Sequence, residues 1–239
     1  MGRWLLTPDM TIVEGSFELF NSVIKSHHRL TYDGADRIIA DRTNDELCFI
    51  LTNLGIFALK QKKANKAKDE YRKKENSDLP KSIHESALTD TSVSANIIQE
   101  NMLLFGKSKG ELARDKNSPY IFRGCDDQIS MKLKNITSDN LDDFSRPLSY
   151  YTSVPTRHAG LTYDVYSHSS APGRRASDTV NQFIDDALIL NPNPTDEEVR
   201  FWIDETERLS KHFNETKQRV DAFSRQYNYI HSKRRVRRR

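Results

Sequence analysis

A long helix near the C-terminus is the strongest constraint that this sequence places on its fold. Glu198 follows Thr195 at the spacing of an N-terminal capping box, and Pro194 directly precedes the pair. Apolar residues then recur at helical spacing, so we expect a helix over residues 196–231. The inner face of this helix is predicted to hold Val199, Trp202, Ile203, Leu209, Phe213, Val220, Phe223, Tyr227 and Ile230.

Helical periodicity also predicts helices over residues 32–40, 44–75 and 92–112. Thr31 precedes the first of these and is a suitable N-cap. The second becomes polar on all sides after Lys60, so we expect its second half to project into solvent. A further helix is expected to begin near Pro172, with a buried stripe made of Val180, Phe183, Ile184, Ala187 and Leu188.

Strand signals occupy shorter segments. Residues 9–24 carry two β-rich runs around Gly15 and predict two strands joined by a turn. Residues 158–168 alternate in polarity and indicate an extended segment, whereas residues 117–153 are rich in turn residues. We therefore expect one α+β domain over residues 1–231, in which long helices pack on a small, mostly antiparallel sheet.

The composition is that of a polar globular chain. Apolar residues make up 36% and charged residues 30%, and no apolar run approaches the roughly 18 residues that a membrane helix needs. The first residues turn acidic and polar too soon for a secretory signal. Cys48 and Cys125 have no metal-ligand spacing, so we interpret them as unpaired thiols in a reducing compartment. We expect a cytoplasmic protein with no membrane partner.

The formal net charge of the chain is only +3, but its last eight residues, 232–239, are almost entirely Lys and Arg. A block of like charges is usually a solvated, disordered tail. It would also attract any polyanion weakly and without sequence preference. The flexible tail is the favoured interpretation, and a specific contact is the alternative.

The stretch "YSHSSAPGRRASD" at residues 166–178 has two interpretations. An Arg174 at a helix start could bind phosphate, because the first turn of a helix carries free N–H groups and partial positive charge. The guanidinium would add a bidentate fork that matches phosphate oxygens. In the alternative interpretation, Arg174 and Arg175 simply pair with nearby carboxylates such as Asp178.

The same stretch resembles the signature of the RNB domain of the RNase II/RNase R family, roughly Y-x-H-(F)-T-S-P-I-R-R-Y-x-D. Further resemblances follow in the family's order at residues 22–39, 95–113 and 149–168, so that the resemblance covers about the C-terminal two-thirds of an RNB domain. The residues in register with the signature are Tyr166, His168, Ser170, Pro172, Arg174, Arg175 and Asp178.

The resemblance implies a 3′-to-5′ exoribonuclease that hydrolyses single-stranded RNA with Mg²⁺ held by a cluster of aspartates. It implies that Arg174 holds the scissile phosphate and that Arg175 supports the channel or the fold. Tyr32, in the family's L-T-Y segment, would lie near the RNA end. The expected RNA-binding residues are Arg174, Arg175, Tyr32, His168 and Ser170, with Arg174 as the catalytic phosphate clamp.

Two departures from the family affect the expected activity. The family's aspartate motif, close to D-P-x-D-A-x-D-x-D-D-A, has no counterpart, and the acidic pairs at 126–127 and 142–143 lack its spacing. The magnesium ligands are therefore expected to be absent from this chain. The OB-fold domains that flank RNB domains have no counterpart either, and the basic residues 232–239 stand where the last one would begin.

The arginine signature also contains smaller residues than the family has. Ser169 replaces an aromatic residue, Gly173 an isoleucine and Ala176 a tyrosine, and Ser170-Ala171 replaces Thr-Ser. We expect these changes to loosen packing behind the phosphate site. The main hypothesis is the RNA-binding part of an exoribonuclease, truncated or degenerate and inactive alone, with a second chain supplying the aspartates. The alternatives are a non-catalytic RNB-like module that binds RNA or protein, and a basic helical interaction protein with a chance resemblance.

Overall fold

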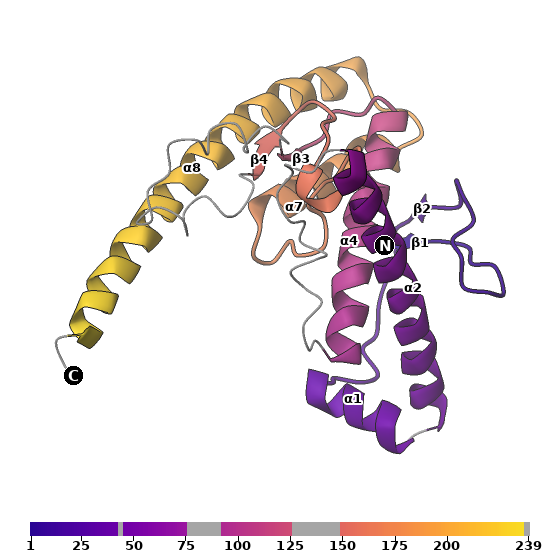
Figure 1. The fold of residues 1–239 in the computed structure, drawn as a ribbon. Helices are drawn as coiled ribbons and strands as arrows, with labels where there is room; N and C mark the ends of the chain where they lie inside the picture. Colours follow the sequence, from indigo (N-terminus) through magenta and orange to yellow (C-terminus); the bar gives the residue numbers. More distant parts are fainter. Residues whose placement is uncertain (43–44, 76–91, 126–148, 237–239) are drawn as a thin grey trace.

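The computed structural model describes residues 1–42, 45–75, 92–125 and 149–236. The described elements are mainly helices, together with two small antiparallel sheets (Figure 1). This is the α+β class that the sequence predicts. The acidic pairs at 126–127 and 142–143 lie outside the described residues.

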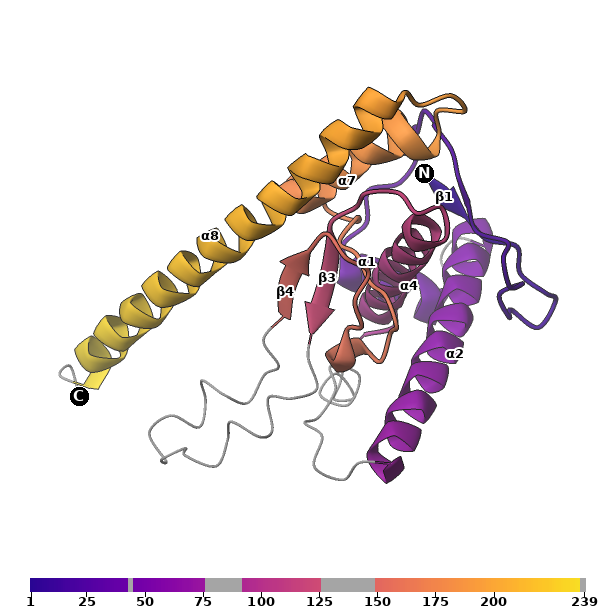
Figure 2. The same cartoon turned by 90° about the horizontal axis from the view of Figure 1, so that it is seen from above.

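Three helices form the N-terminal part of the fold: α1 (Tyr32–Asp41), α2 (Asp45–Glu75) and α4 (Val93–Asp115). The predicted cap of α1 is confirmed, because Thr31 Oγ1 accepts a hydrogen bond from the N–H of Gly34 at 3.1 Å. Helices α2 and α4 run side by side in both views, and α1 packs against one end of the pair (Figures 1 and 2).

The first sheet pairs β1 (Gly2–Arg3) with β2 (Glu18–Leu19). The prediction of two strands within residues 9–24 was therefore only half right, because the partner of β2 lies at the very start of the chain. The Trp4 ring packs 5.2 Å from the Phe17 ring and 6.3 Å from the Phe105 ring of α4, which fixes this pairing. The turn at Gly15 is confirmed by a φ of +71°.

The second sheet pairs β3 (Phe122–Cys125) with β4 (Ser149–Thr152). The sequence did not predict either strand, because both are four residues long and lie among turn residues. The segment 158–168, predicted to be extended, contains the 3₁₀ turn η3 (Ala159–Leu161) and then an isolated bridge from Ser167 to Phe122.

The C-terminal elements are α7 (Ala176–Ile184), the π-turn η4 (Asp185–Ile189) and α8 (Asp196–Val236). The capping box of α8 is confirmed: Thr195 N–H donates to Glu198 Oε2 at 2.8 Å, and Glu198 N–H donates to Thr195 Oγ1 at 3.2 Å. The helix continues to Val236, five residues beyond the predicted end. The division into a domain at 1–231 and a basic tail at 232–239 stays a prediction.

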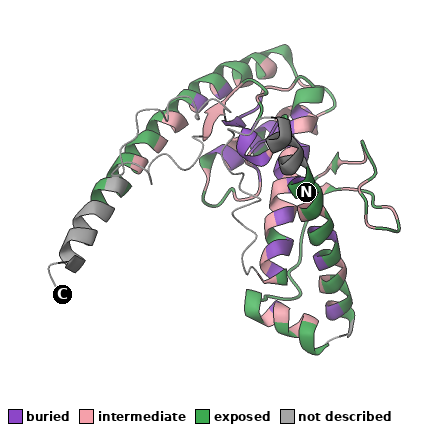
Figure 3. Ribbon diagram, in the orientation of Figure 1, coloured by how far each residue is buried: buried purple, intermediate pink, exposed green. Residues whose placement is uncertain are grey.

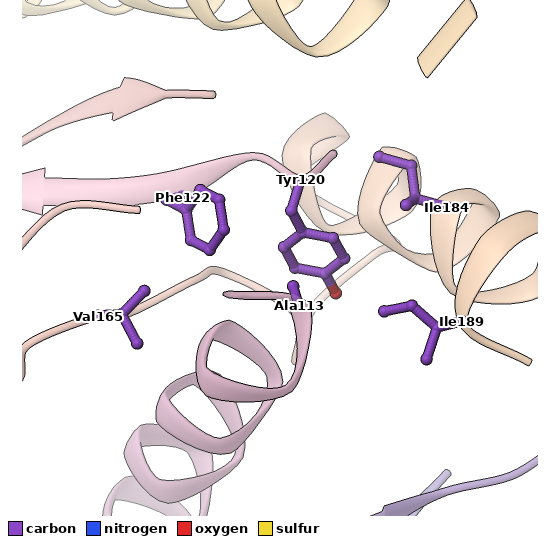
Figure 4. Close-up of a cluster of buried hydrophobic side chains, with 6 residues drawn as sticks. All are labelled: Ala113, Tyr120, Phe122, Val165, Ile184 and Ile189. Carbon is purple, nitrogen blue, oxygen red and sulfur yellow. The ribbon is translucent and has the colours of Figure 1, made fainter. Parts of the chain in front are cut away.

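The core lies where α4, β3 and α7 meet. Buried residues concentrate there, whereas the outward sides of α2 and α8 are exposed (Figure 3). In Figure 4 the ring of Tyr120 lies among apolar side chains from four segments of the chain. Its hydroxyl donates to Asp185 Oδ1 at 3.1 Å, and the same carboxylate forms a buried ion pair with Lys109. The side chains of this cluster are Ala113, Tyr120, Phe122, Val165, Ile184 and Ile189.

Candidate nucleic-acid interface

The loop of residues 166–175 lies between α4 and β3. Ser167 donates from its N–H and from its hydroxyl to the carbonyl oxygen of Gly106, at 3.1 and 3.2 Å. A Cβ atom on Gly106 would stand 2.5 Å from the Ser167 carbonyl oxygen, so only glycine allows this approach. On the other side, the N–H of Arg123 in β3 donates to the Tyr166 carbonyl at 2.8 Å.

Asn181 of α7 ties the loop to the core. Its side chain is fully buried, and its amide nitrogen donates to the carbonyls of Ile121 and His168 at 2.9 and 3.1 Å. Its amide oxygen accepts from the N–H of Ile121 at 3.0 Å. One side chain therefore satisfies three buried backbone groups, and it fixes α7, the loop and the start of β3 together.

Arg175 is held against the buried carboxylate of Asp178. Its Nε and Nη2 donate to Asp178 Oδ2 at 3.0 and 2.7 Å, and Nη2 also donates to Ser170 Oγ at 3.1 Å. The same carboxylate oxygen accepts from the N–H of Ala171 at 2.7 Å. The interpretation that the arginines pair with carboxylates therefore holds for Arg175. Its contacts, together with that of Ala171, link residues 170 and 171 to Asp178.

Arg174 is exposed, and no hydrogen bond or ion pair of its side chain occurs among the described residues. It does not lie in the first turn of a helix, because α7 begins at Ala176 rather than near Pro172. The contact between Asp178 and Ala171 holds the chain in a turn there, and Arg174 N–H donates to Ala171 O within that turn at 3.1 Å. Its guanidinium therefore faces solvent from a braced turn just before the helix.

His168 is packed between two tyrosines. Its ring lies edge-on to Tyr166 and Tyr151, each with a centroid distance of 5.8 Å, and its Nδ1 is 3.4 Å from the Tyr151 hydroxyl. Burial and, after it, the positive charges of Arg175 and Arg123 lower the pKa of His168 to about 3. His168 is therefore neutral at pH 7, and it supports the loop rather than adding positive charge to it.

Three further residues belong to this cluster, and the sequence did not single them out: Arg123, Tyr151 and His158. Arg123 lies 4.3 Å over the Tyr151 ring, and the His158 ring lies edge-on to Tyr166 at 5.6 Å. Burial lowers the pKa of His158 to about 4, with the charge of Arg123 as the second cause. The available signal was a charged residue between apolar neighbours in the sequence "YIFRGC", which marks a buried cation that needs a partner.

Tyr32 is not part of this cluster. It is 54% exposed at the start of α1, and it lines an apolar hollow with Leu30 and Leu51. Figure 1 shows α1 at the end of the α2 and α4 pair that is distant from α7. The structure thus brings together Arg174, Arg175, His168 and Ser170, and it places Tyr32 apart from them.

The carboxylates near the loop do not fit a magnesium site. Asp178 already accepts from Arg175 and Ala171, and Asp185 from Tyr120 and Lys109. In the described part of the chain, no group of three or more His, Cys, Asp or Glu side chains could hold a metal ion. We therefore derive no metal-dependent step from these residues.

Comparison with known proteins identifies the family. The family model of the RNB domain matches residues 3–191, most of the chain. The chain belongs to the RNB domain family. A curated relative, an uncharacterized ribonuclease of Synechocystis sp., is 25% identical over 185 residues, which are 70% of this chain and 26% of the relative.

Solved structures of ribonucleases share the fold. RNase R of Mycoplasma genitalium in complex with ribose-methylated single-stranded RNA gives a TM-score of 0.73 at 14% identity, over 95% of this chain and 42% of that one. The same enzyme with double-stranded RNA gives 0.71 at 13% identity, over 95% and 48%. The Dss1 exoribonuclease of Candida glabrata gives 0.56 at 15% identity, over 87% and 32%. The chain thus spans less than half the length of these proteins.

In the RNB signature, this chain has smaller residues than the family at several positions, and only some of these positions are buried. Gly173 and Ala176 are exposed, and nothing lies within 4 Å of a Cβ built on Gly173. At these two positions the expected loosening of the site is wrong, because larger side chains would face solvent. Ser169 is buried, and its hydroxyl lies 3.2 Å from that of Ser167.

No helix in the described ranges of this RNB chain is long and apolar enough to cross a membrane. Both cysteines, Cys48 and Cys125, are buried, and neither takes part in a disulfide bond, as the sequence predicts.

Proposed function

We propose that this chain binds single-stranded RNA through the loop of residues 166–175, as the RNA-binding part of a 3′-to-5′ exoribonuclease of the RNase II/RNase R type. One observation carries the proposal: Arg174 projects an exposed guanidinium from a turn that Arg175, Asp178 and Asn181 brace from behind. A held turn presents its charge with little loss of entropy on binding. Support also comes from the RNA bound in the Mycoplasma genitalium RNase R structures.

The five expected RNA-binding residues have different roles in this proposal. Arg174 contacts the phosphate, and Arg175 and Ser170 hold the turn that carries it. His168, neutral at pH 7, supports the loop from inside. Tyr32 forms a separate contact on α1, where an exposed ring could stack on a base.

We also propose that the chain does not hydrolyse RNA alone and that a second chain supplies the aspartates for Mg²⁺. The two buried carboxylates near the loop are already engaged, Asp178 by Arg175 and the N–H of Ala171 and Asp185 by Lys109 and the Tyr120 hydroxyl, which supports this view. Two buried cysteines that form no disulfide bond support a cytoplasmic, reducing location. The alternative is a non-catalytic RNB-like module that binds RNA or protein. The same engaged carboxylates support it.

Incubation of a 5′-fluorescent single-stranded RNA with the purified chain and Mg²⁺ tests the activity. We expect binding without shortening. A ladder that shortens from the 3′ end would show that the chain is active alone. A further outcome is that the RNA shortens only after a chain with the RNB aspartate motif is added. That result supports the proposal of an exoribonuclease part over that of a non-catalytic module.

The substitution Arg174→Ala is expected to weaken single-stranded RNA binding by roughly 10- to 150-fold, because a hydrogen bond to a charged group contributes about 1.5–3 kcal/mol. Fluorescence anisotropy at constant salt measures the change. Arg200→Ala removes the same charge from an exposed position on α8 and serves as the matched control. Equal affinities for R174A, R200A and the parent chain would remove Arg174 from the interface.

A further inference from the structure

The C-terminal part of α8 carries an exposed apolar stripe. Val220, Phe223 and Tyr227 follow one another at spacings of three and four residues, so they lie on one helix face. They are 55%, 68% and 53% exposed. The rings of Phe223 and Tyr227 are stacked, with centroids 6.4 Å apart and an interplanar angle of 27°.

The stripe lies C-terminal to the residues through which α8 packs on β4. Nearer its start, α8 packs on β4: the Phe213 ring lies 5.5 Å from the Tyr151 ring, and Asn214 bonds both backbone groups of Tyr151. Beyond this contact the helix extends away from the other described elements (Figure 2). The predicted inner face of α8 is therefore wrong at Val220, Phe223 and Tyr227, and Ile203 nearer the start of the helix is 50% exposed as well.

The positive charge of the chain is concentrated at the same end. Residues 217–239 contain nine Lys or Arg and one Asp, a formal charge of +8. Because the whole chain is +3, the other 216 residues together carry a charge of −5. The long-range attraction for a polyanion therefore comes from this segment and not from the body of the protein.

We propose that the end of α8 is a second binding site for single-stranded RNA, in which Phe223 and Tyr227 stack on bases and the exposed Arg219, one helical turn before Phe223, contacts a phosphate. Exposed aromatic rings combined with positive charge are the usual means of sequence-independent binding to single strands. The site rests on the proposed function only in the choice of RNA as the polyanion.

A protein partner fits these features less well. Two copies of the chain would bring two segments of +8 together, and the repulsion opposes that contact. A stripe of three apolar side chains is also small for a stable interface, which needs about 800 Å² on each partner. Charge complementarity thus favours a nucleic acid as the occupant.

The test uses the full chain with the double substitution Phe223→Ala and Tyr227→Ala. The probes are a fluorescent oligouridylate and an abasic oligomer with the same number of phosphates. We expect the affinity for oligouridylate to fall by at least about tenfold and that for the abasic oligomer to stay unchanged, because base stacking contributes about 1–3 kcal/mol per base. Phe201→Ala, an exposed ring near the start of α8, is the matched control and should leave both affinities unchanged.

Three outcomes would overturn this site. They are an unchanged affinity for oligouridylate, an equal loss for both probes, and a change in molar mass by light scattering without a change in RNA binding. The last would assign the stripe to contacts between copies of the chain. R174A should lower the affinity for both probes alike, whereas the double substitution should lower only that for oligouridylate. A negative result for the proposed role of Arg174 can therefore be distinguished from a negative result for this site.

Discussion

Lowering the pH from 7 to about 4 is expected to remove several kcal/mol from the free energy of unfolding. The cause is a pair of histidines behind the loop, the buried His158 and the partly buried His168. Burial and the neighbouring arginines lower the pKa of His158 to about 4 and that of His168 to about 3, from an ordinary value of 6.5.

The sign follows from which state binds protons. Below pH 6.5 both imidazoles become charged in the unfolded chain but stay neutral in the folded protein, so protons favour unfolding. Each histidine then lowers the unfolding free energy by about 1.4 kcal/mol per pH unit until its folded pKa is reached. The full effect of both is therefore expected between pH 6.5 and 4, and only His168 continues to contribute below that.

Glu100 acts in the opposite direction. Its carboxyl group is buried, and burial raises its pKa above the ordinary value. The folded state therefore binds this proton more readily than the unfolded chain does, and acid stabilises the protein through Glu100. One such carboxyl group offsets part of the loss from two histidines without reversing it.

Urea unfolding at pH 7, 6 and 5 measures how the free energy of unfolding depends on pH. His158→Gln and His168→Gln are each expected to reduce the dependence on pH by roughly half, because each removes one of the two groups. Phe213→Leu, a change against the same tyrosine that leaves both histidines in place, is the control. A double histidine variant that keeps the full slope would show that other groups cause it.

The sequence predicted best what depends on near neighbours. The N-caps of α1 and α8 were predicted from Thr31 and from Thr195 with Glu198, because a cap and its N–H group lie within three residues of each other. The start of α7 was predicted wrongly. It depends on the contact between Asp178 and Ala171, which are seven residues apart in a loop without helical spacing.

The candidate site depends on contacts between distant segments, and the sequence could predict it only in part. Resemblance to the RNB signature singled out Arg174, and the nearness of Asp178 in the sequence suggested, as the alternative interpretation, the ion pair that Arg175 forms. It could not identify Asn181, whose partner Ile121 is 60 residues away, or the position of Arg123 over Tyr151. Helical spacing also predicted an apolar face on α8 correctly, but it cannot tell whether another element covers that face.

The substitution Asn181→Ala is expected to lower the free energy of unfolding by at least about 3 kcal/mol. It would leave three buried backbone groups without partners: the N–H and carbonyl of Ile121 and the carbonyl of His168. Each unsatisfied buried group costs about 1–3 kcal/mol. Because the same bonds brace the turn that carries Arg174, RNA affinity should fall as well, even where the variant is still folded.

Chemical denaturation at pH 7 gives the stability, and anisotropy at a temperature where the variant is fully folded gives the affinity. Gln182→Ala, at the exposed neighbouring position, should change neither, since both variants remove an amide side chain from α7. A loss below about 1 kcal/mol in N181A would mean that water replaces the lost bonds. In that case the loop does not depend on Asn181, and the braced turn must be attributed to Arg175 and Asp178 alone.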